Sequence, residues 1–450
     1  MDSFTEYVNA NRERFIAELQ DFCRQPSVAA QNWGMREMAD KVVARFKQLG
    51  AEVRLIPVGD GAPVVYAEIG RGKRTLLIYD HYDVQPPEPL NQWETGPWDA
   101  VVRDGKLFAR GVADNKGNLM CRIQAIEAYL MAVGDLPLKI KFVVEGEEEI
   151  GSVHLPQFAR ENRALLQDAD GCLWEAGYKD INERPVLSCG VKGIVCVELH
   201  AHGAKRDLHS AAATIVPNPA WRLTWALATL KDADDHILID DYQQHVRPPT
   251  PEEMAALETI PRDDEKLKAD YGIPAFIRNL GGIELLKKHL YEPTVTICGL
   301  YSGYIGEGSK TVLPNHAFAK LDFRLVPNLT PDLVVELLRK HLDRRGFNDI
   351  EIVLTEAGEE VARSPLDSAI VRAAVAAAKE VYASDPIVYP TMAGSGPMYP
   401  LCQALGIPAV SAGCGWHDSR AHAPNESIRL ADYFEGMAFV RSLIDRFAAM

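Results

Sequence analysis

The chain has 450 residues, of which 47% are hydrophobic and 25% charged, and its formal net charge is −15 at pH 7. This is the composition of a globular chain long enough for two or three domains. The negative charge argues against nucleic acid or an anionic membrane as a partner, because both need clustered Lys and Arg.

The first residues, MDSFTEYVNANRERF, are polar and acidic, and no apolar run approaches 18 residues. We therefore expect neither a signal peptide nor a membrane-spanning helix. The eight cysteines include no C-x-x-C pair. That spacing predicts reduced, mostly buried thiols in a cytoplasmic protein, and it favours neither a disulfide framework nor a zinc ribbon.

The first part of the chain alternates between predicted strands and helices. A helix is expected over 33–49, with an apolar face and Gly50 as its C-terminal stop. Further along, the pattern predicts strands at 64–69, 75–79, 138–144 and 171–174, and a helix at 116–133. Buried strands that alternate with helices indicate a mostly parallel sheet covered by helices on both faces.

The pattern changes near residue 186. Residues 195–202 and 317–324 alternate between apolar and polar, as in a sheet with one solvated face, and a charged helical stretch lies between them at about 220–290. Thr330-Pro331-Asp332 is typical of a helix N-terminus. From residue 364 an Ala-rich helical pattern returns, followed by a buried run at 408–412. We predict an α/β domain (1–188 and 359–450) interrupted by an inserted α+β domain (189–358).

Possible metal ligands follow four of the predicted strands. They are His81 and Asp83 after 75–79, four glutamates in E145-G-E-E-E-I-G-S152 after 138–144, Glu175 after 171–174, and His417 and His422 after 408–412. Asp114 precedes a predicted helix. Ligand sites of α/β proteins form beyond the carboxyl ends of the strands. Singly, an acidic turn is usually solvated, an Asp before a helix is often only an N-cap, and a lone His is often structural. Their meeting at one sheet edge favours a metal site.

These motifs resemble those of the dinuclear metallopeptidase family of carnosine dipeptidase, carboxypeptidase G and aminoacylase. Nearly the whole chain is covered, and the motifs follow the family order: H81-Y-D83-V, G111-V-A-D114-N-K-G117, E148-E149-I-G-S152, Glu175, D207-L-H209-S210 and A421-H-A-P-N-E426. Glu175 stands where several relatives have Asp, and both residues occur in the family. Each motif alone is a weak signal, but six in order are a strong one.

The resemblance implies a role for each of these residues. Asp114 would bridge two divalent ions, with His81 and Glu175 completing one site and Glu149 and His422 the other. Asp83 would orient His81. Glu148 would be the general base that takes a proton from the metal-bridging water and passes it to the leaving amine. The two metals would offset the repulsion within the glutamate turn, in which Glu145 receives no role and Glu147 is interpreted as facing solvent.

The inserted domain would be a lid that also forms a homodimer. His209 would stabilise the oxyanion in the partner subunit's site, and Arg324 would bind a substrate carboxylate, unless Arg324 only pairs with Asp322. Ser395 lies in a G394-S-G396 turn that resembles a substrate-binding turn of the family.

The resemblance implies a peptidase that acts on dipeptides or similar small peptides with a free C-terminal carboxylate. Zinc is the expected ion, with manganese and cobalt as alternatives. An N-acyl amino acid deacylase or a short-peptide carboxypeptidase is the second hypothesis. A metal-free binding or scaffold homologue is the remote one, and such a protein would lack ligands that this chain retains.

Other motifs give weaker indications of function. His417 lies outside the A-H-x-x-N-E frame, and the two histidines of H200-A-H202 are interpreted as a chance pair on one strand face. G306-E-G-S-K-T311 departs from a phosphate loop by one residue, and the chain contains neither H-E-x-x-H nor G-x-S-x-G.

Overall fold

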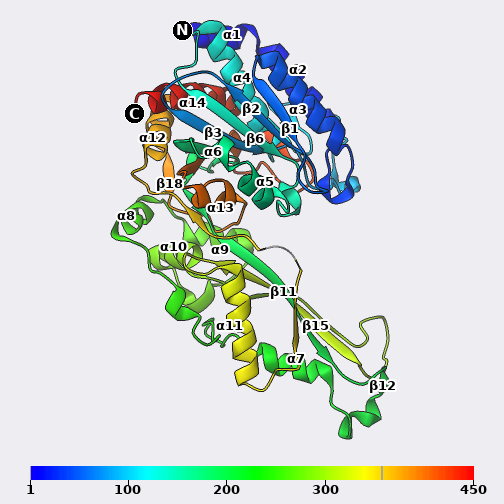
Figure 1. Ribbon diagram of the computed structural model, residues 1–450. Helices are drawn as coiled ribbons and strands as arrows, with labels where there is room; N and C mark the ends of the chain where they lie inside the picture. Colours follow the sequence, from blue (N-terminus) through cyan, green and yellow to red (C-terminus); the bar gives the residue numbers. More distant parts are fainter. Residues whose placement is uncertain (1, 356–357) are drawn as a thin grey trace. The chain divides into compact units, whose positions relative to one another are not determined.

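A computed structural model describes residues 2–355 and 358–450 (Figure 1). The chain forms two compact units. The first comprises Met1–Gly190, Arg363–Thr391 and Pro397–Met450, and the second comprises Val191–Ala362 and Met392–Gly396. The expected domain boundaries and their roles stay a prediction, and the grouping of Met392–Gly396 with the second unit was not anticipated. No helix within the described residues is long and apolar enough to cross a membrane.

The first unit is built on an eight-stranded sheet in the order β1-β2-β6-β3-β7-β19-β9-β18. Its strands are β1 (Glu52–Ile56), β2 (Val64–Ile69), β3 (Thr75–His81), β6 (Lys139–Glu145), β7 (Gly171–Trp174), β9 (Val186–Ser188), β18 (Ile387–Tyr389) and β19 (Ala409–Ser411). The central strands β6, β3, β7 and β19 are parallel, whereas β1 and β2 add an antiparallel edge. The predicted mostly parallel sheet is confirmed, and the antiparallel edge was not predicted.

Helices cover both faces of this sheet. Figure 1 shows α4 (Lys116–Ala132) and α14 (Leu430–Ala448) on one side of it, and α5 (Leu155–Glu161) and α6 (Arg163–Leu166) on the other. The helix predicted over 33–49 is α3 (Met35–Leu49), which buries Met38, Val42 and Phe46 and ends at Gly50 with φ 85°. Glycine is the residue that adopts this left-handed conformation without strain. Because α4 is buried nearly all round, it presents polar groups to the core that must find partners there.

The second unit is an antiparallel sheet with helices. The sheet order is β13-β15-β11-β16, formed by β13 (Thr296–Ser302), β15 (His316–Leu325), β11 (Gly193–His202) and β16 (Glu351–Leu354). In β11 and β15 alternate residues are buried, as the sequence pattern predicted. The remaining regular elements include α7 (Pro219–Leu227), α8 (Pro251–Thr259), α9 (Asp264–Tyr271), α10 (Gly282–Tyr291) and α11 (Pro331–Arg344), and the Thr330 side chain caps α11 as expected. The Ala-rich helix, α12 (Ala369–Val381), belongs to the first unit.

Candidate metal centre

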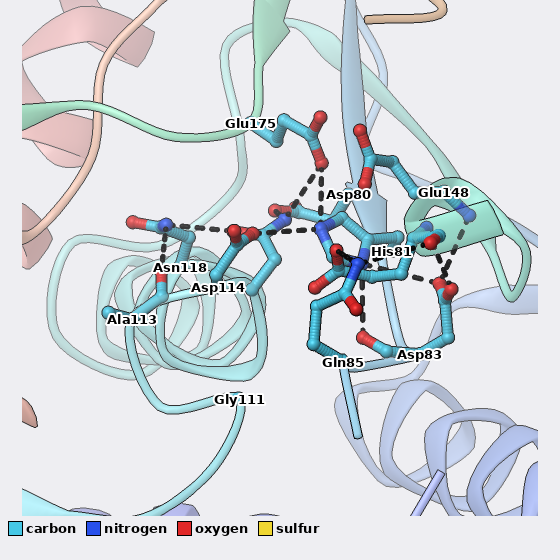
Figure 2. A network of polar contacts seen from close by, with 12 residues as sticks. Asp80, His81, Asp83, Gln85, Gly111, Ala113, Asp114, Asn118, Glu148 and Glu175 are labelled. Carbon is cyan, nitrogen blue, oxygen red and sulfur yellow. Dashed lines mark hydrogen bonds and ion pairs between the residues drawn. The ribbon is translucent and has the colours of Figure 1, made fainter. Parts of the chain in front are cut away.

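Two groups of possible metal ligands lie in the first unit, at the carboxyl ends of the parallel strands. Figure 2 shows His81, Glu148 and Glu175 together with Asp114. One group consists of His81, Glu148 and Glu175, and the other of Asp114, Glu149 and His422. Within each group the ligand atoms lie within 4.8 Å of one another. These are the only such groups among the described residues, so all five predicted ligands, together with Glu148, are drawn into one place.

Asp114 lies between the two groups. Its Oδ1 is 3.1 Å from Nε2 of His81, and its Oδ2 is 3.0 Å from Nε2 of His422. Nε2 of His81 is also 3.2 Å from Glu175 Oε2, and Nε2 of His422 is 3.1 Å from Glu149 Oε2. One carboxylate therefore faces two imidazoles, each of which has a second carboxylate beside it.

The local sequence explains why the loop that carries Asp114 is tightly folded. It runs into the first turn of α4, where a Cβ on Gly117 would lie 2.0 Å from the carbonyl oxygen of Val112. Only glycine allows this approach. The buried carboxylate of Glu426 accepts hydrogen bonds from the backbone N–H groups of Gly111 (2.9 Å), Ala113 (2.8 Å) and Asp114 (3.1 Å). Glu426 also accepts a hydrogen bond from Nη1 of the buried Arg110 at 2.7 Å.

Asp83 contacts both the imidazole of His81 and the backbone of the glutamate turn. Nδ1 of His81 lies 3.1 Å from the backbone oxygen of Asp83 and 3.3 Å from its Oδ1. The Asp83 carboxylate accepts hydrogen bonds from the backbone N–H groups of Glu148 (3.3 Å) and Glu149 (3.0 Å). Because the buried Asp83 contacts Nδ1 of the His81 imidazole, the Nε2 atom of this ring is directed at Asp114 and Glu175.

Glu148 and Glu149 are adjacent but differ in their surroundings. Gln85 donates from Nε2 to Oε2 of Glu149 at 2.9 Å and to its backbone oxygen at 3.2 Å. No described residue donates a hydrogen bond to the carboxylate of Glu148. The turn closes tightly after β6, since a Cβ on Gly146 would lie 2.4 Å from the hydroxyl of Tyr82.

The charges of the cluster shift its pKa values strongly. Burial disfavours the His81 imidazolium, but the Glu175, Asp114 and Asp83 carboxylates outweigh it and raise the pKa of His81 well above its usual value. Hydrogen bonds to Asp114 and Glu149 raise the pKa of His422 to about 10. Burial raises the pKa of Glu148 and of Glu175 well above the usual range. These shifts show that full ionisation of the cluster is unfavourable without added positive charge, which a bound cation would supply.

The donor set fits two divalent ions. Two imidazole nitrogens and several carboxylate oxygens are the ligand types of zinc, manganese and cobalt sites, and a carboxylate that faces both groups suits a bridging position. The orientation of the His81 imidazole by the buried Asp83 is also the usual arrangement around such ions.

One interpretation of the glutamate turn was wrong. Glu147 does not face solvent: it is 7% exposed, and its carboxylate accepts hydrogen bonds from the backbone of Ala62 (3.0 Å) and lies 2.8 Å from Nδ1 of His154. Glu145 is buried as well and accepts hydrogen bonds from Tyr79 (2.6 Å) and Ser152 (2.8 Å). Burial raises the pKa of Glu145 to about 8. The four glutamates look solvated in sequence because the folding that buries them, and distant partners such as Tyr79 and Ala62, cannot be read from the local pattern.

The other predicted residues belong to the second unit. Arg324 donates from Nη1 to Oγ of Ser395 at 2.8 Å, so two of the expected substrate contacts meet, and its Nε lies 3.5 Å from Asp322. His209 is exposed, and its Nδ1 accepts a hydrogen bond from Ala211 N–H at 3.1 Å.

The lesser motifs are also resolved. His417 is exposed and belongs to neither ligand group. His200 and His202 do share a strand face, where the cross-strand His316 joins them; Nδ1 of His200 lies 2.9 Å from its Nε2. The stretch from Gly306 to Thr311 precedes a short strand rather than a helix, so it lacks the frame of a phosphate loop.

Sequence reasoning missed several residues that hold the ligands. Gln85, Asn115 and Glu426 lie inside or next to the motifs, which is the only signal that pointed to them. Asp80 and Arg122 form a buried ion pair at 2.8 Å, and Arg122 lies outside every motif.

The sequence profile of Peptidase family M20/M25/M40 matches residues 77–446. The chain belongs to this family. Family membership implies that this M20 chain uses divalent metal ions, and it confirms the predicted enzyme class.

The similar proteins cover between 78% and 97% of the M20 chain. Beta-Ala-His dipeptidase of Rattus norvegicus is 27% identical over 97% of this chain and 93% of its own length. Cys-Gly metallodipeptidase of Schizosaccharomyces pombe is 31% identical over 78% of this chain and 77% of its own length. The solved structure of an M20 family metallo-carboxypeptidase from Sulfolobus solfataricus is 39% identical, with a TM-score of 0.92 over 97% of this chain and 99% of that one. This likeness confirms the predicted fold class.

Proposed function

We propose that the protein is a dinuclear metal-dependent hydrolase that cleaves the amide bond of dipeptides or similar small peptides with a free C-terminal carboxylate. The observation that carries the proposal is the position of Asp114, whose two carboxylate oxygens face His81 and His422 at 3.1 and 3.0 Å. The names of the dipeptidase relatives support the substrate class.

In this proposal Asp114 would bridge the two ions. His81 and Glu175 would complete one site, and Glu149 and His422 would complete the other. When bound, the ions supply Lewis-acid stabilisation of developing negative charge and lower the pKa of water. Zinc is the proposed ion, with manganese and cobalt as alternatives.

Glu148 acts as the general base and acid. Its carboxylate accepts no hydrogen bond from the described residues, so it is free to take a proton from the attacking water. Without bound ions, burial and the neighbouring carboxylates raise the pKa of Glu148. With both ions bound, Glu148 would act as the carboxylate that accepts the proton and returns it to the leaving amine. Asp83 keeps His81 in the tautomer and orientation that a ligand needs, and its hydrogen bonds to the backbone of Glu148 and Glu149 fix the turn.

Substrate contacts are proposed for His209, Arg324 and Ser395. Because Nδ1 of His209 accepts a hydrogen bond from Ala211, the ring proton of the neutral imidazole sits on Nε2, which is then a free donor for an oxyanion. Arg324 uses one nitrogen on Ser395, and the remaining donors of its guanidinium can bind a carboxylate bidentately.

We further propose a cytoplasmic homodimer formed through the second unit. This unit exposes Ile215 (85%), Trp221 (58%) and Trp225 (56%), and the two tryptophan rings stack on α7 with centroids 6.0 Å apart. Large aromatic residues gathered on a surface are typical of interfaces. All eight cysteines are free thiols, as expected in a reducing compartment.

A short-peptide carboxypeptidase is the second candidate, because the similar solved structure at 39% identity is described as a metallo-carboxypeptidase. An N-acyl amino acid deacylase is a further alternative, but none of the similar proteins named above is described as a deacylase. The test supplies metal-depleted protein with each ion and compares dipeptides, tripeptides to pentapeptides, and N-acetyl and N-succinyl amino acids. Fastest turnover of dipeptides supports the proposal. Faster release of the last residue from longer peptides would favour the carboxypeptidase, and no hydrolysis with any ion would refute both.

A further inference from the structure

Arg122 is a buried cation behind the candidate metal centre. It lies on α4, is 2% exposed, and donates four hydrogen bonds: to the backbone oxygens of Tyr79 (2.8 Å), Trp174 (2.7 Å) and Ala412 (2.9 Å), and to Oδ1 of Asp80 (2.8 Å). A guanidinium is costly to bury unless its donors are used, and here both terminal nitrogens donate twice.

The three carbonyl groups belong to three neighbouring strands. Strands β3, β7 and β19 are adjacent and parallel in the sheet. The pairing of β3 with β7 ends at Ile78 and Leu173, so the carbonyl groups of the next residues lie beyond the last pair. Arg122 supplies donors to these strand ends, and its planar guanidinium fixes their spacing.

Each strand end leads directly to a proposed ligand. Tyr79 lies two residues before His81, Trp174 immediately precedes Glu175, and Ala412 opens the segment that reaches His422. A displacement of these ends would therefore change the distances between ligands from different strands.

Asp80 extends the network to a fourth segment. It is fully buried, and its Oδ1 accepts a second hydrogen bond, from Nδ2 of Asn115 at 2.8 Å. Asn115 follows Asp114 in the chain, and its Nδ2 also lies 3.4 Å from Glu175 Oε2. Figure 2 shows Asp80 between Glu175 and His81, close to Asp114.

We propose that Arg122 is a positioning residue for the metal centre: its guanidinium holds the strand ends that carry His81 and Glu175, the segment that leads to His422, and, through Asp80 and Asn115, the loop of Asp114. The inference rests on the proposed two-metal function. Stability alone explains the ion pair poorly, since well-packed apolar residues often replace such pairs without loss. We infer that the planar guanidinium of Arg122 instead fixes the distances between the ends of the three strands.

The test compares Arg122→Met and Arg122→Lys with a matched control, Arg45→Met. Arg45 is also a buried arginine of the first unit, 6% exposed, and its ion-pair partners among the described residues, Glu127 and Glu18, are not proposed ligands or neighbours of one. Zinc affinity is measured by competition with a chromophoric chelator, at a temperature at which circular dichroism shows every metal-free variant to be folded. The kcat and KM of dipeptide hydrolysis are measured in parallel.

Zinc affinity should fall about 10- to 100-fold in Arg122→Met, the usual effect of residues that orient ligands. It should fall less in Arg122→Lys, because an ammonium cannot span three carbonyls. Arg45→Met should lower thermal stability and leave zinc affinity unchanged.

If Arg122→Met does not fold, the comparison is made with Arg122→Lys and Asp80→Asn. Wild-type affinity in the Arg122 variants, or an equal loss in Arg45→Met, would overturn the inference. Wild-type protein that binds no zinc would instead refute the proposed function.

Discussion

Glu426 offers the sharpest test of how the Asp114 loop is held. Each of its carboxylate oxygens accepts two hydrogen bonds: Oε2 from Arg110 and Gly111, and Oε1 from Ala113 and Asp114. The substitution Glu426→Gln keeps the shape but replaces one oxygen with an NH₂ group, which is itself a donor. Whichever way the amide lies, two buried donors lose their acceptor.

The expected loss is large because the carboxylate and its arginine partner are buried. Glu426 is fully buried and Arg110 is 1% exposed, so the substitution also leaves a guanidinium without its counter-charge. Breaking a buried pair by removing one partner typically costs about 3 to 5 kcal/mol. We expect a decrease of that size in the free energy of unfolding of the metal-free protein, measured in urea. Because Asp114 is proposed to bridge both ions, zinc affinity should also fall, by about 10- to 100-fold.

Glu127→Gln is the matched control. Glu127 is a partly buried carboxylate that also pairs with arginine, and its ion-pair partners among the described residues, Arg14 and Arg45, lie outside the loops of the proposed ligands. This variant should be less stable and bind zinc normally. The reasoning is refuted if Glu426→Gln unfolds at the wild-type urea concentration, or if it is destabilised and still binds two ions with wild-type affinity.

Three further predictions follow from the proposed roles. Elemental analysis of active protein should give close to two divalent ions per chain, and one ion or none would contradict the dinuclear centre. Glu148→Gln should retain both ions while kcat falls by about 10²- to 10⁴-fold, because only the proton carrier is lost. Glu149→Gln should lose an ion as well, and equal metal content with near-native kcat in both variants would show the roles to be misassigned. Mixing inactive His209→Ala with inactive Glu148→Gln should restore activity toward about a quarter of wild type, since random exchange gives mixed dimers with one intact site. If native mass spectrometry detects mixed dimers without recovery, His209 does not act in the partner's site.

The sequence predicted those features that local pattern encodes. Periodicity located β7 and the C-terminal end of α3 to the residue, and the strand ends indicated where the ligands gather. The motifs named residues that the structure brings together into two groups of possible metal ligands, and their role as ligands stays a prediction.

What the sequence did not predict depends on pairing between distant segments. The antiparallel edge of β1 and β2 is a matter of sheet order, which periodicity does not report. The solvent-facing interpretation of Glu147 failed because its partners, Ala62 and His154, are set by tertiary packing. Arg122 looked like an ordinary helix residue, since its acceptors lie on three strands that only the folded sheet makes neighbours.

The first unit is assembled from separate stretches of chain, and this determines when the ligand cluster can exist. Strand β19 joins β7 more than two hundred residues after β7 in the chain, and Glu426 reaches back to the loop at Gly111 from 315 residues away. During synthesis on a ribosome, the N-terminal stretch must therefore wait with its sheet edge unpaired and its acidic loops unsupported while the second unit emerges. Contacts so far apart in sequence form slowly, and such waiting chains are prone to aggregation. If the proposed ligand set holds the ions, metal would bind fully only after the C-terminal stretch that carries His422 has docked, and metal uptake would then report completed folding.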